Sequence, residues 1–408
     1  MRKFYLLLLS ASLTIPAIAI ADTTPPIHKH KNHKSHKVHR TRKVDKIHYK
    51  EEALAVPAKA SDNSSNFKIT GYIDGSYNYE TRNKFTSDNY DRVFDQVPNG
   101  LTLQQAATTI AYQPSEGFGG LLNLIAGRDA NVIAPYGFKP VSEFDSQTIA
   151  VDFTQAYLQF VKGPITVIGG RFTTLAGAEQ IDPTQNTNFS RSIIFYSAPD
   201  THTGLRVTYA VNDKLSLIAG INDGWDNIRD WSRRKTVELG MSLTVNPMFS
   251  FSIQGYNGQE RATPQTSFGP LGMRTLIDVI ATLNATDKLT LIANYDNAWQ
   301  TNAALPTGNN GRAAWSGIAG YANYKFNDKW RTSLRGEIFD DKNGFRTGVR
   351  QNWREATLTV GYAPIKNLEV RAETRHDFSN VNSFVSSTGV SVSNNQQSYA
   401  LEGVYKFG

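Results

Sequence analysis

The side chains best placed to act together lie between Leu368 and Phe378. Every second residue there is charged, in the order Glu369, Arg371, Glu373, Arg375 and Asp377. Alternate residues of a β-strand point to one face, so a strand here would carry a single line of carboxylates and guanidinium groups. That line can be a salt-bridged wall that stiffens a barrel, or the source of a transverse field that orients hydrated solutes. The sequence leaves both interpretations open.

A second set of candidate ligands lies near the N-terminus. Residues 28–50 hold six of the eight histidines and nine Lys or Arg residues against Asp45 alone. Closely spaced neutral imidazoles can share a transition-metal ion, which makes weak metal candidates of His28, His30, His33, His36 and His39. No carboxylate or cysteine completes a defined geometry. We therefore favour a solvated polycation that contacts anionic surfaces, and we predict neither a metal site nor a cofactor.

Catalytic motifs are missing from the sequence. There is no G-x-S-x-G, no H-E-x-x-H, no P-loop and no cysteine. His376 adjoins Asp377, but neighbouring residues of a strand point to opposite faces and cannot form a simple dyad. We therefore predict that the protein is not an enzyme. The net charge of +7 is concentrated in the N-terminal segment and does not indicate nucleic-acid binding.

The first residues are typical of an exported protein. Arg2 and Lys3 precede an apolar run that ends at Ala19-Ile20-Ala21, which predicts a signal peptide over residues 1–21. Residues 22–66 are basic, His/Lys-rich and poor in apolar side chains, so they are expected to form a disordered tail and linker. No later apolar run reaches the ~18 residues of a membrane-spanning helix.

From Phe67 onward the dominant pattern is alternation of apolar and polar residues, which indicates β-strands. Phe67, Ile69 and Ile73 fall on one face, opposite Lys68 and Asp74. Similar alternation recurs over residues 236–245, 249–254 and 398–407. A β-sandwich would show the same periodicity, so the class of fold depends on the connections.

Short and long connections alternate along residues 67–408. Seven short turns are predicted at 113–118, 162–164, 212–214, 246–248, 286–288, 327–329 and 364–367. Longer polar stretches lie between them, among them 81–99, 173–204, 258–274 and 379–396. This arrangement is typical of a transmembrane antiparallel up-and-down β-barrel of about 16 strands in the bacterial outer membrane. Short turns and both termini would face the periplasm, and long loops the exterior.

A repeated segment supports the hairpin unit. "VNDKLSLIAGINDGWDN" at 211–227 resembles "ATDKLTLIANYDNAWQT" at 285–301 and "FNDKWRTSLRGEIFDDK" at 326–342. Each copy is interpreted as a tight polar turn followed by a spanning strand. One region breaks the pattern: Val151 and Phe153 are out of phase with Ala156 and Leu158, which indicates a β-bulge somewhere in residues 151–172.

The apolar face of each strand must meet lipid, so charged residues must face the lumen. A charge on the lipid side would cost roughly 2–4 kcal/mol near the midplane. The predicted pore-lining residues are Asp74, Glu238, Asp278, Asp296, Arg331, Arg335, Glu337, Glu355, Glu369, Arg371, Glu373, Arg375, Asp377 and Glu402. A lumen enclosed by about 16 strands is too wide for side chains to fill and is expected to hold water.

The longest connection, residues 173–204, contains Arg191 and His202. A loop of this length can fold inward and narrow the channel, or it can cover the outer mouth. The two residues are therefore candidates for a constriction.

Three blocks carry a family resemblance: "AGRDA" at 126–130, "GGRFTTLAGAE" at 169–179 and "NFSRSIIFYSAPDTHTGLRVTY" at 188–209. With the 211–227 segment, they resemble the OmpL-like β-barrel porins over about residues 67–408. The resemblance implies a water-filled outer-membrane channel for small hydrophilic solutes and ions, surrounded by lipid and able to form a homo-oligomer. A structural or adhesive barrel with a plugged lumen is the alternative. Two features depart from the family: Gly408 follows the terminal Phe407, and the His/Lys tail has no counterpart.

Overall fold

The computed structural model describes residues 67–81, 92–133, 150–230, 233–261, 271–385 and 391–408. The predictions for the signal peptide, the basic tail and its histidines concern residues 1–66 and lie outside the described residues.

The described chain forms a closed antiparallel barrel of sixteen strands, which confirms the predicted fold class. Consecutive strands pair along the ring, and β1 pairs with β18 to close it, with Gly71 opposite Phe407. Closure pairs both edges of the sheet, so no strand edge in the ring is left open. The ring strands are β1 (Phe67–Glu80), β2 (Gly100–Tyr112), β3 (Gly117–Gly127), β4 (Ala150–Lys162), β5 (Ile165–Thr173), β6 (Thr201–Ala210), β7 (Leu215–Asn222), β8 (Thr236–Asn246), β9 (Phe249–Arg261), β10 (Leu271–Asn284), β11 (Leu289–Ala304), β12 (Asn310–Lys325), β13 (Trp330–Asp341), β14 (Gln351–Ile365), β15 (Leu368–Ser379) and β18 (Asn395–Phe407).

The two faces of the ring have opposite chemistry. Apolar side chains such as Ile73, Leu239 and Leu334 are 49%, 61% and 53% exposed on the outer face. Their neighbours Asp74, Glu238 and Arg335 are buried on the inner face. The alternation in the sequence thus separates a lipid-facing surface from a polar interior.

The repeated turn has a local cause. Asn212 Oδ1 accepts hydrogen bonds from the backbone N–H groups of Lys214 and Leu215, at 2.9 and 3.0 Å. Asn246 and Asn327 do the same for the residues two and three positions on. In the copy at residues 285–301 the Thr286 hydroxyl takes the place of the Asn amide oxygen. The side chain satisfies donors that a tight turn leaves unpaired, and the motif recurs at four of the seven short turns.

All seven short turns lie where the sequence predicts them. Among the eight other connections, the one between β11 and β12 is an exception, because it covers only residues 305–309. Strands β11 and β12 are longer than the strands beside them and include residues that the sequence would leave to a longer loop. The link between β15 and β18 contains a small ladder of its own, β16 (Phe384–Val385) with β17 (Ser391–Ser393).

The phase change near residue 151 comes from a β-bulge in β4. Asn123 of β3 pairs with Gln155, and the next residue Leu124 pairs with Phe153, so Thr154 is the extra residue. Val151 and Phe153 before the bulge and Leu158 after it are therefore all exposed on the outer face.

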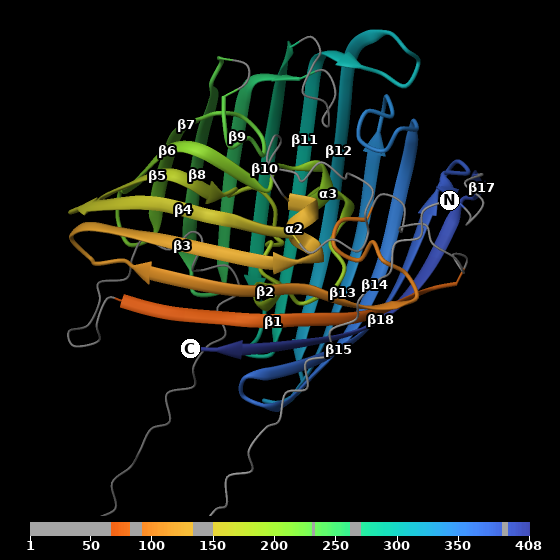
Figure 1. Cartoon of the computed structure of the whole chain (residues 1–408), viewed down its shortest axis with the longest axis horizontal. Coiled ribbons are helices and arrows are strands. Elements are labelled where there is room, and N and C mark those ends of the chain that lie inside the picture. The colour runs from red at the N-terminus through yellow and green to blue at the C-terminus, as the bar shows by residue number, and fades with distance from the viewer. Residues whose placement is uncertain (1–66, 82–91, 134–149, 231–232, 262–270, 386–390) are drawn as a thin grey trace, which may run out of the picture. The chain divides into compact units, whose positions relative to one another are not determined.

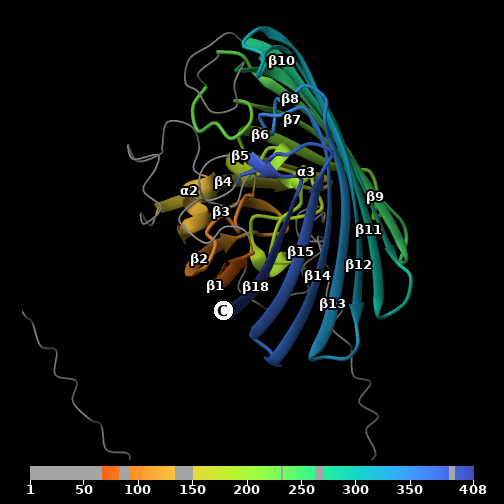
Figure 2. The same cartoon turned by 90° about the vertical axis from the view of Figure 1, so that its right-hand side faces the viewer.

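Three short helical segments are described: α2 (Arg128–Ile133), the 3-10 turn η1 (Pro183–Gln185) and α3 (Ile193–Ser197). Helix α3 lies within the ring of strands in two perpendicular views (Figures 1 and 2), and α2 packs against β2, β3 and β4. Among the described residues no helix is long and apolar enough to cross a membrane.

Candidate functional site

The connection between β5 and β6, residues 174–200, folds into the interior of the ring; it is called the inner loop below. Every residue in it is buried or half-buried, although it is a connection between strands. It contains η1 and α3, and α3 packs on β12 and β13 (Figure 2). A segment this deep inside must find partners for its backbone groups.

Four inward arginines supply donors to backbone carbonyl groups of the inner loop. All four lie on β13 and β15, and each donates from a terminal guanidinium nitrogen. The pairs are Arg331 with Thr187 at 2.7 Å, Arg335 with Ser190 at 2.6 Å, Arg375 with Arg191 at 2.6 Å and Arg371 with Pro183 at 3.1 Å. The basic side of the wall therefore holds the loop by its carbonyl oxygens.

Inward carboxylates accept from the loop's backbone N–H groups. Glu337 accepts from Ile193 and Ile194, both at 2.7 Å, which are the first two N–H groups of α3. These donors have no partner within a helix, and a carboxylate is their best acceptor. Glu373 accepts from Phe189 and Ser190 at 2.7 and 2.9 Å, and Asp278 accepts from Gly177 at 3.0 Å.

Arg335 is the centre of this attachment. Its side chain is fully buried and forms ion pairs with Glu179 of the loop at 2.6 Å and with Glu355 of the wall at 2.7 Å. It also donates to the Ser190 carbonyl, the Ser190 hydroxyl and the Thr357 hydroxyl. A guanidinium has five N–H groups, and these five bonds use all of them. Glu179 and Glu355 thus share the positive charge of Arg335.

Apolar contacts complete the attachment on this side. Gly317 of β12 lies beneath the inner loop, because a Cβ added there would meet Ile194 Cγ2 at 2.3 Å. Trp315 donates from its indole nitrogen to the carbonyl of Ser197 at 3.2 Å. The buried cluster around them also includes Ala176, Ile193, Phe339 and Trp353. The inward face of β12 thus carries small and aromatic residues, such as Ala313, Trp315 and Ala319, where the loop docks.

The base of the inner loop is fixed by Tyr256 of β9. Its hydroxyl accepts from the backbone N–H of Leu175 and from the Thr174 hydroxyl, both at 3.2 Å, and donates to Glu238 at 3.1 Å. Glu238 in turn accepts from Arg206 at 3.0 Å. The predicted pore residue Glu238 therefore lies in a bonded row at the start of the loop.

The loop also reaches the opposite wall. Phe195 packs edge-on against Phe94 of the β1–β2 connection, with ring centroids 5.7 Å apart, and the Arg191 guanidinium lies 5.1 Å from the Phe94 ring centre. Gln105 of β2 donates to the Ile181 carbonyl at 3.1 Å. Residues of α2 belong to the same buried cluster. The inner loop, the β1–β2 connection and α2 thus pack together in the interior of the ring.

All fourteen predicted pore residues point inward, and most pair with one another. Arg331 and Arg371 bind Glu369 at 2.6 and 2.8 Å, and Arg371 also binds Glu402 at 3.0 Å. Arg375 binds Asp377 at 2.8 Å. Asp278 and Asp296 lie directly opposite each other on β10 and β11, and Asn294 donates to both. Asp74 faces inward on β1.

The structure places the two candidates for a constriction, Arg191 and His202, in different elements. Arg191 lies in the inner loop and donates to the carbonyls of Gln180, Ile181 and Phe189. His202 lies in strand β6 rather than in the connection, because pairing with Phe172 extends β6 back to Thr201. Its ring is fully buried and stacks on Tyr256 with centroids 4.7 Å apart. His202 therefore helps to form the base of the loop.

Sequence reasoning missed several residues of this site. Glu179, Tyr256, Trp315 and Gln105 each join the inner loop to a different part of the wall. A carboxylate in the small-residue segment "LAGAE" and a tryptophan among small residues of one β12 face were available signals. The backbone partners of the four arginines have no signature in a sequence.

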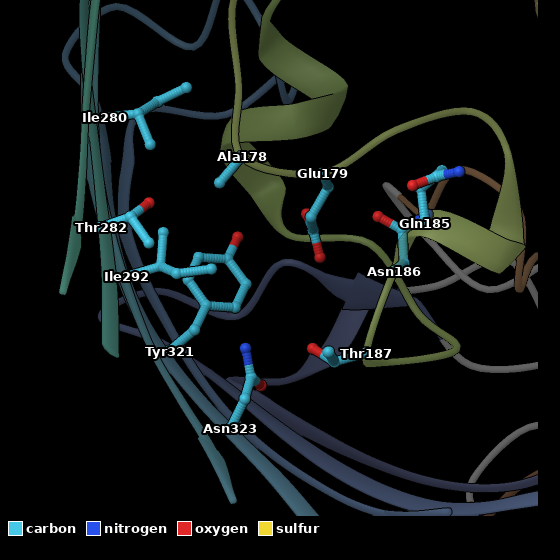
Figure 3. Close-up of a pocket in the computed structure, with 10 residues that line it drawn as sticks. All are labelled: Ala178, Glu179, Gln185, Asn186, Thr187, Ile280, Thr282, Ile292, Tyr321 and Asn323. Atoms are coloured by element: carbon cyan, nitrogen blue, oxygen red, sulfur yellow. The ribbon is translucent and has the colours of Figure 1, made fainter. Parts of the chain in front are cut away.

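A small cavity remains between the inner loop and β10–β12, with a volume of about 30 Å³. Figure 3 shows Tyr321 and Asn323 of β12 facing Glu179 and Thr187 of the loop across it. Its size suits one or two water molecules. Among the described residues no group of three or more His, Cys, Asp or Glu side chains is placed to hold a metal ion.

Comparison with known proteins agrees with this architecture. A family model described as "Putative beta-barrel porin-2, OmpL-like" matches residues 66–407. A search of curated proteins gave no match.

Solved structures share the fold at low sequence identity. The outer membrane channel DcaP of Acinetobacter baumannii has a TM-score of 0.55 at 14% identity, over 85% of this chain and 100% of that one. The trimer form of OmpT of Vibrio cholerae has a TM-score of 0.55 at 10% identity, over 84% of this chain and 99% of that one. The anion-selective porin from Comamonas acidovorans has a TM-score of 0.54 at 10% identity, over 84% of this chain and 99% of that one.

Proposed function

The chain belongs to the OmpL-like β-barrel porin-2 family, and from this premise we propose that it carries small hydrophilic solutes and ions passively across the outer membrane through a channel narrowed by the inner loop. The observation that supports the proposal is the docking of residues 174–200 on the inward charged wall of a closed sixteen-stranded ring. The porin family and the barrel fold indicate a channel rather than an enzyme.

One observation favours a second candidate, a structural or adhesive barrel with a plugged lumen. At the level of the inner loop, inward side chains such as Arg335 and Asp377 have no exposed surface. Packing this close leaves little room for solutes among the described residues. Single-channel recording of the purified full-length protein in planar bilayers separates the two, because a plugged barrel gives no conductance steps.

We predict that the channel shows weak cation preference at low salt. The inward acidic residues of the strands somewhat outnumber the inward basic residues, which include Lys68, Arg171, Arg206, Arg274, Arg331, Arg335, Arg371, Arg375 and Lys406. Most of these charges are paired, so the net field is small, and screening weakens it further at high ionic strength. Reversal potentials across a salt gradient measure this preference. A strongly anion-selective value would show that the loop charges around Arg191 control the path.

We also propose that copies of the chain associate through the outer surface of β1–β5. A hollow of about 630 Å³ lies there; its lining includes Gly119, Gly120 and Gly169, and also Phe118 and Leu158, which are 76% and 75% exposed. Protruding apolar side chains next to a hollow suit packing of one copy against another. The trimer form of OmpT gives a precedent for the fold. Light scattering in detergent should find more than one copy, and fewer after Leu158→Asp.

The role of residues 1–66 is a proposal from the sequence. Residues 1–21 would be removed on export to the outer membrane, and residues 22–66 would remain in the periplasm before the barrel, where nine cations can contact anionic surfaces. N-terminal sequencing of the exported protein is expected to begin at Asp22.

A further inference from the structure

Strand β14 carries a cation on its outer face, close to the end of the ring where the long connections lie. Arg354 is exposed, whereas Trp353 and Glu355 on either side of it are buried on the inner face. Its partner on β15 is Phe378, which is also exposed. Arg354 thus lies at the level of an outward aromatic ring, the depth at which the apolar band of a barrel meets the headgroups.

Two further cations lie just beyond the strands. Asp341 and Gln351 are the last residues that pair between β13 and β14, and both side chains are buried. Lys342 and Arg350 are the neighbours of these two residues on the connection, and both are exposed. Because side chains alternate between the faces of a strand, Lys342 and Arg350 extend the outer face on which Arg354 lies. The three residues Lys342, Arg350 and Arg354 are called the cation patch below.

The connection between β13 and β14, residues 342–350, is held in a compact form. Asp341 accepts from three successive backbone N–H groups of the connection, at 2.9 to 3.0 Å. Lys342 continues the pairing with β12, because its N–H donates to the Ala314 carbonyl at 3.1 Å. The backbone of the patch is therefore fixed by the fold, and little ordering is needed when an anion binds there.

Negative charge on the same face does not balance the patch. Asp340 of β13 lies there and is half-buried, which leaves three cations against one carboxylate. Arg354 donates from Nε to the amide oxygen of Asn352 at 3.3 Å, a neutral acceptor. Among the described residues the patch forms no ion pair, in contrast to the inward arginines of β13 and β15. Its cations are thus available to an anion from outside the chain.

An apolar surface adjoins the patch on the membrane side. Ile338 pairs with Arg354, and Leu334 pairs with Leu358 four residues nearer the middle of the two strands. These three apolar side chains are exposed on the outer face. Cations above an apolar surface complement a lipid that has an anionic headgroup and acyl chains. A guanidinium also matches the oxygen atoms of a phosphate with its fixed fork of N–H groups.

We propose that the cation patch binds the phosphate groups of lipopolysaccharide, the phosphorylated glycolipid of the outer leaflet. The orientation predicted from the sequence places this end of the barrel outside. Outward charges cost little at the interface, and anionic headgroups attract them. The acyl chains then lie along Ile338 and Leu334. The site does not involve conduction, so it is independent of the proposed channel function.

The test compares the binding of diphosphorylated and dephosphorylated lipid A to the purified full-length protein in detergent. The unaltered protein binds the diphosphorylated form about tenfold more tightly or better, because three cations act together. The preference falls as salt is added. Replacing all three cations by glutamine, as Lys342→Gln, Arg350→Gln and Arg354→Gln, removes the preference. Equal binding of the two lipids by the unaltered protein overturns the proposal.

The matched control removes the same charge from the other end of the barrel. Lys214→Gln, Lys288→Gln and Lys329→Gln change three exposed lysines of short turns. This variant keeps the full preference for the diphosphorylated lipid. An equal loss in both triple variants means that general attraction between the protein and an anionic lipid explains the binding, and the proposed site is then wrong.

A single substitution keeps the proposal testable if the triple variant does not assemble into a heat-modifiable barrel. Arg354→Gln changes one exposed side chain, whose bond to Asn352 is at the surface. It weakens the binding of diphosphorylated lipid A several-fold and leaves that of the dephosphorylated form unchanged. Arg354→Lys keeps the charge and restores part of the loss. Unchanged binding in Arg354→Gln contradicts the proposed role of the patch.

Discussion

Replacing Arg335 by alanine should release the inner loop from the wall and raise the single-channel conductance. The substitution leaves Glu179 and Glu355 as buried charges without their partner, and it removes two bonds to Ser190. Breaking a buried ion pair in this way typically costs about 3–5 kcal/mol. Such a loss would shift the docking equilibrium by a factor of more than about 100.

Arg312→Ala is the matched control for this experiment. Arg312 is also an arginine in the second half of the barrel, but its side chain is exposed near the start of β12. Conductance and heat stability of this variant should match those of the unaltered protein. If Arg335→Ala folds into the same barrel and conducts like the control, then Arg335 does not hold the loop in the conducting path.

Gly317→Val should displace the inner loop by steric pressure alone. A Cβ at this position would lie 2.3 Å from Ile194 Cγ2 and 3.0 Å from Phe339 Cδ2, so α3 must move away. Overpacking of this kind costs roughly 1–3 kcal/mol. Valine is otherwise favoured in strands, so the barrel should assemble and the conductance should increase without any change of charge.

Gly320→Val lies on the same strand and gives the control, because it adds the same side chain to the opposite face. No atom lies within 4 Å of a Cβ built at Gly320, which faces outward. This variant should conduct normally. Equal conductance in the two valine variants would mean that the loop contact at Gly317 does not limit the passage.

The structure gives a definite place to the line of alternating charges between Leu368 and Phe378. Glu369, Arg371, Glu373, Arg375 and Asp377 all lie on the inner face of β15, and each takes part in an ion pair or a bond to the inner loop. Their pairing makes the wall an attachment surface for the loop. The transverse field that we considered for the same residues stays a prediction for the selectivity measurement.

The sequence by itself determined the barrel. Alternation of polarity has a period that only a strand can satisfy, and at four of the short turns an Asn or Thr accepts from the N–H groups two and three positions on. Both signals are local, so they are visible without any knowledge of distant contacts. The inward direction of the charged residues follows in the same way, because lipid excludes them from the outer face.

Only the tertiary structure decided what fills the interior. The inner loop is held largely through its own backbone groups, such as the Ser190 carbonyl and the Ile193 N–H, by side chains more than 140 positions away. Every residue has these backbone groups, so no residue type marks where they will bind. His202 shows the same limit, since its place in β6 depends on pairing with Phe172 of the neighbouring strand β5, thirty residues earlier in the chain. Contacts of this kind exist only once the ring has closed around the loop.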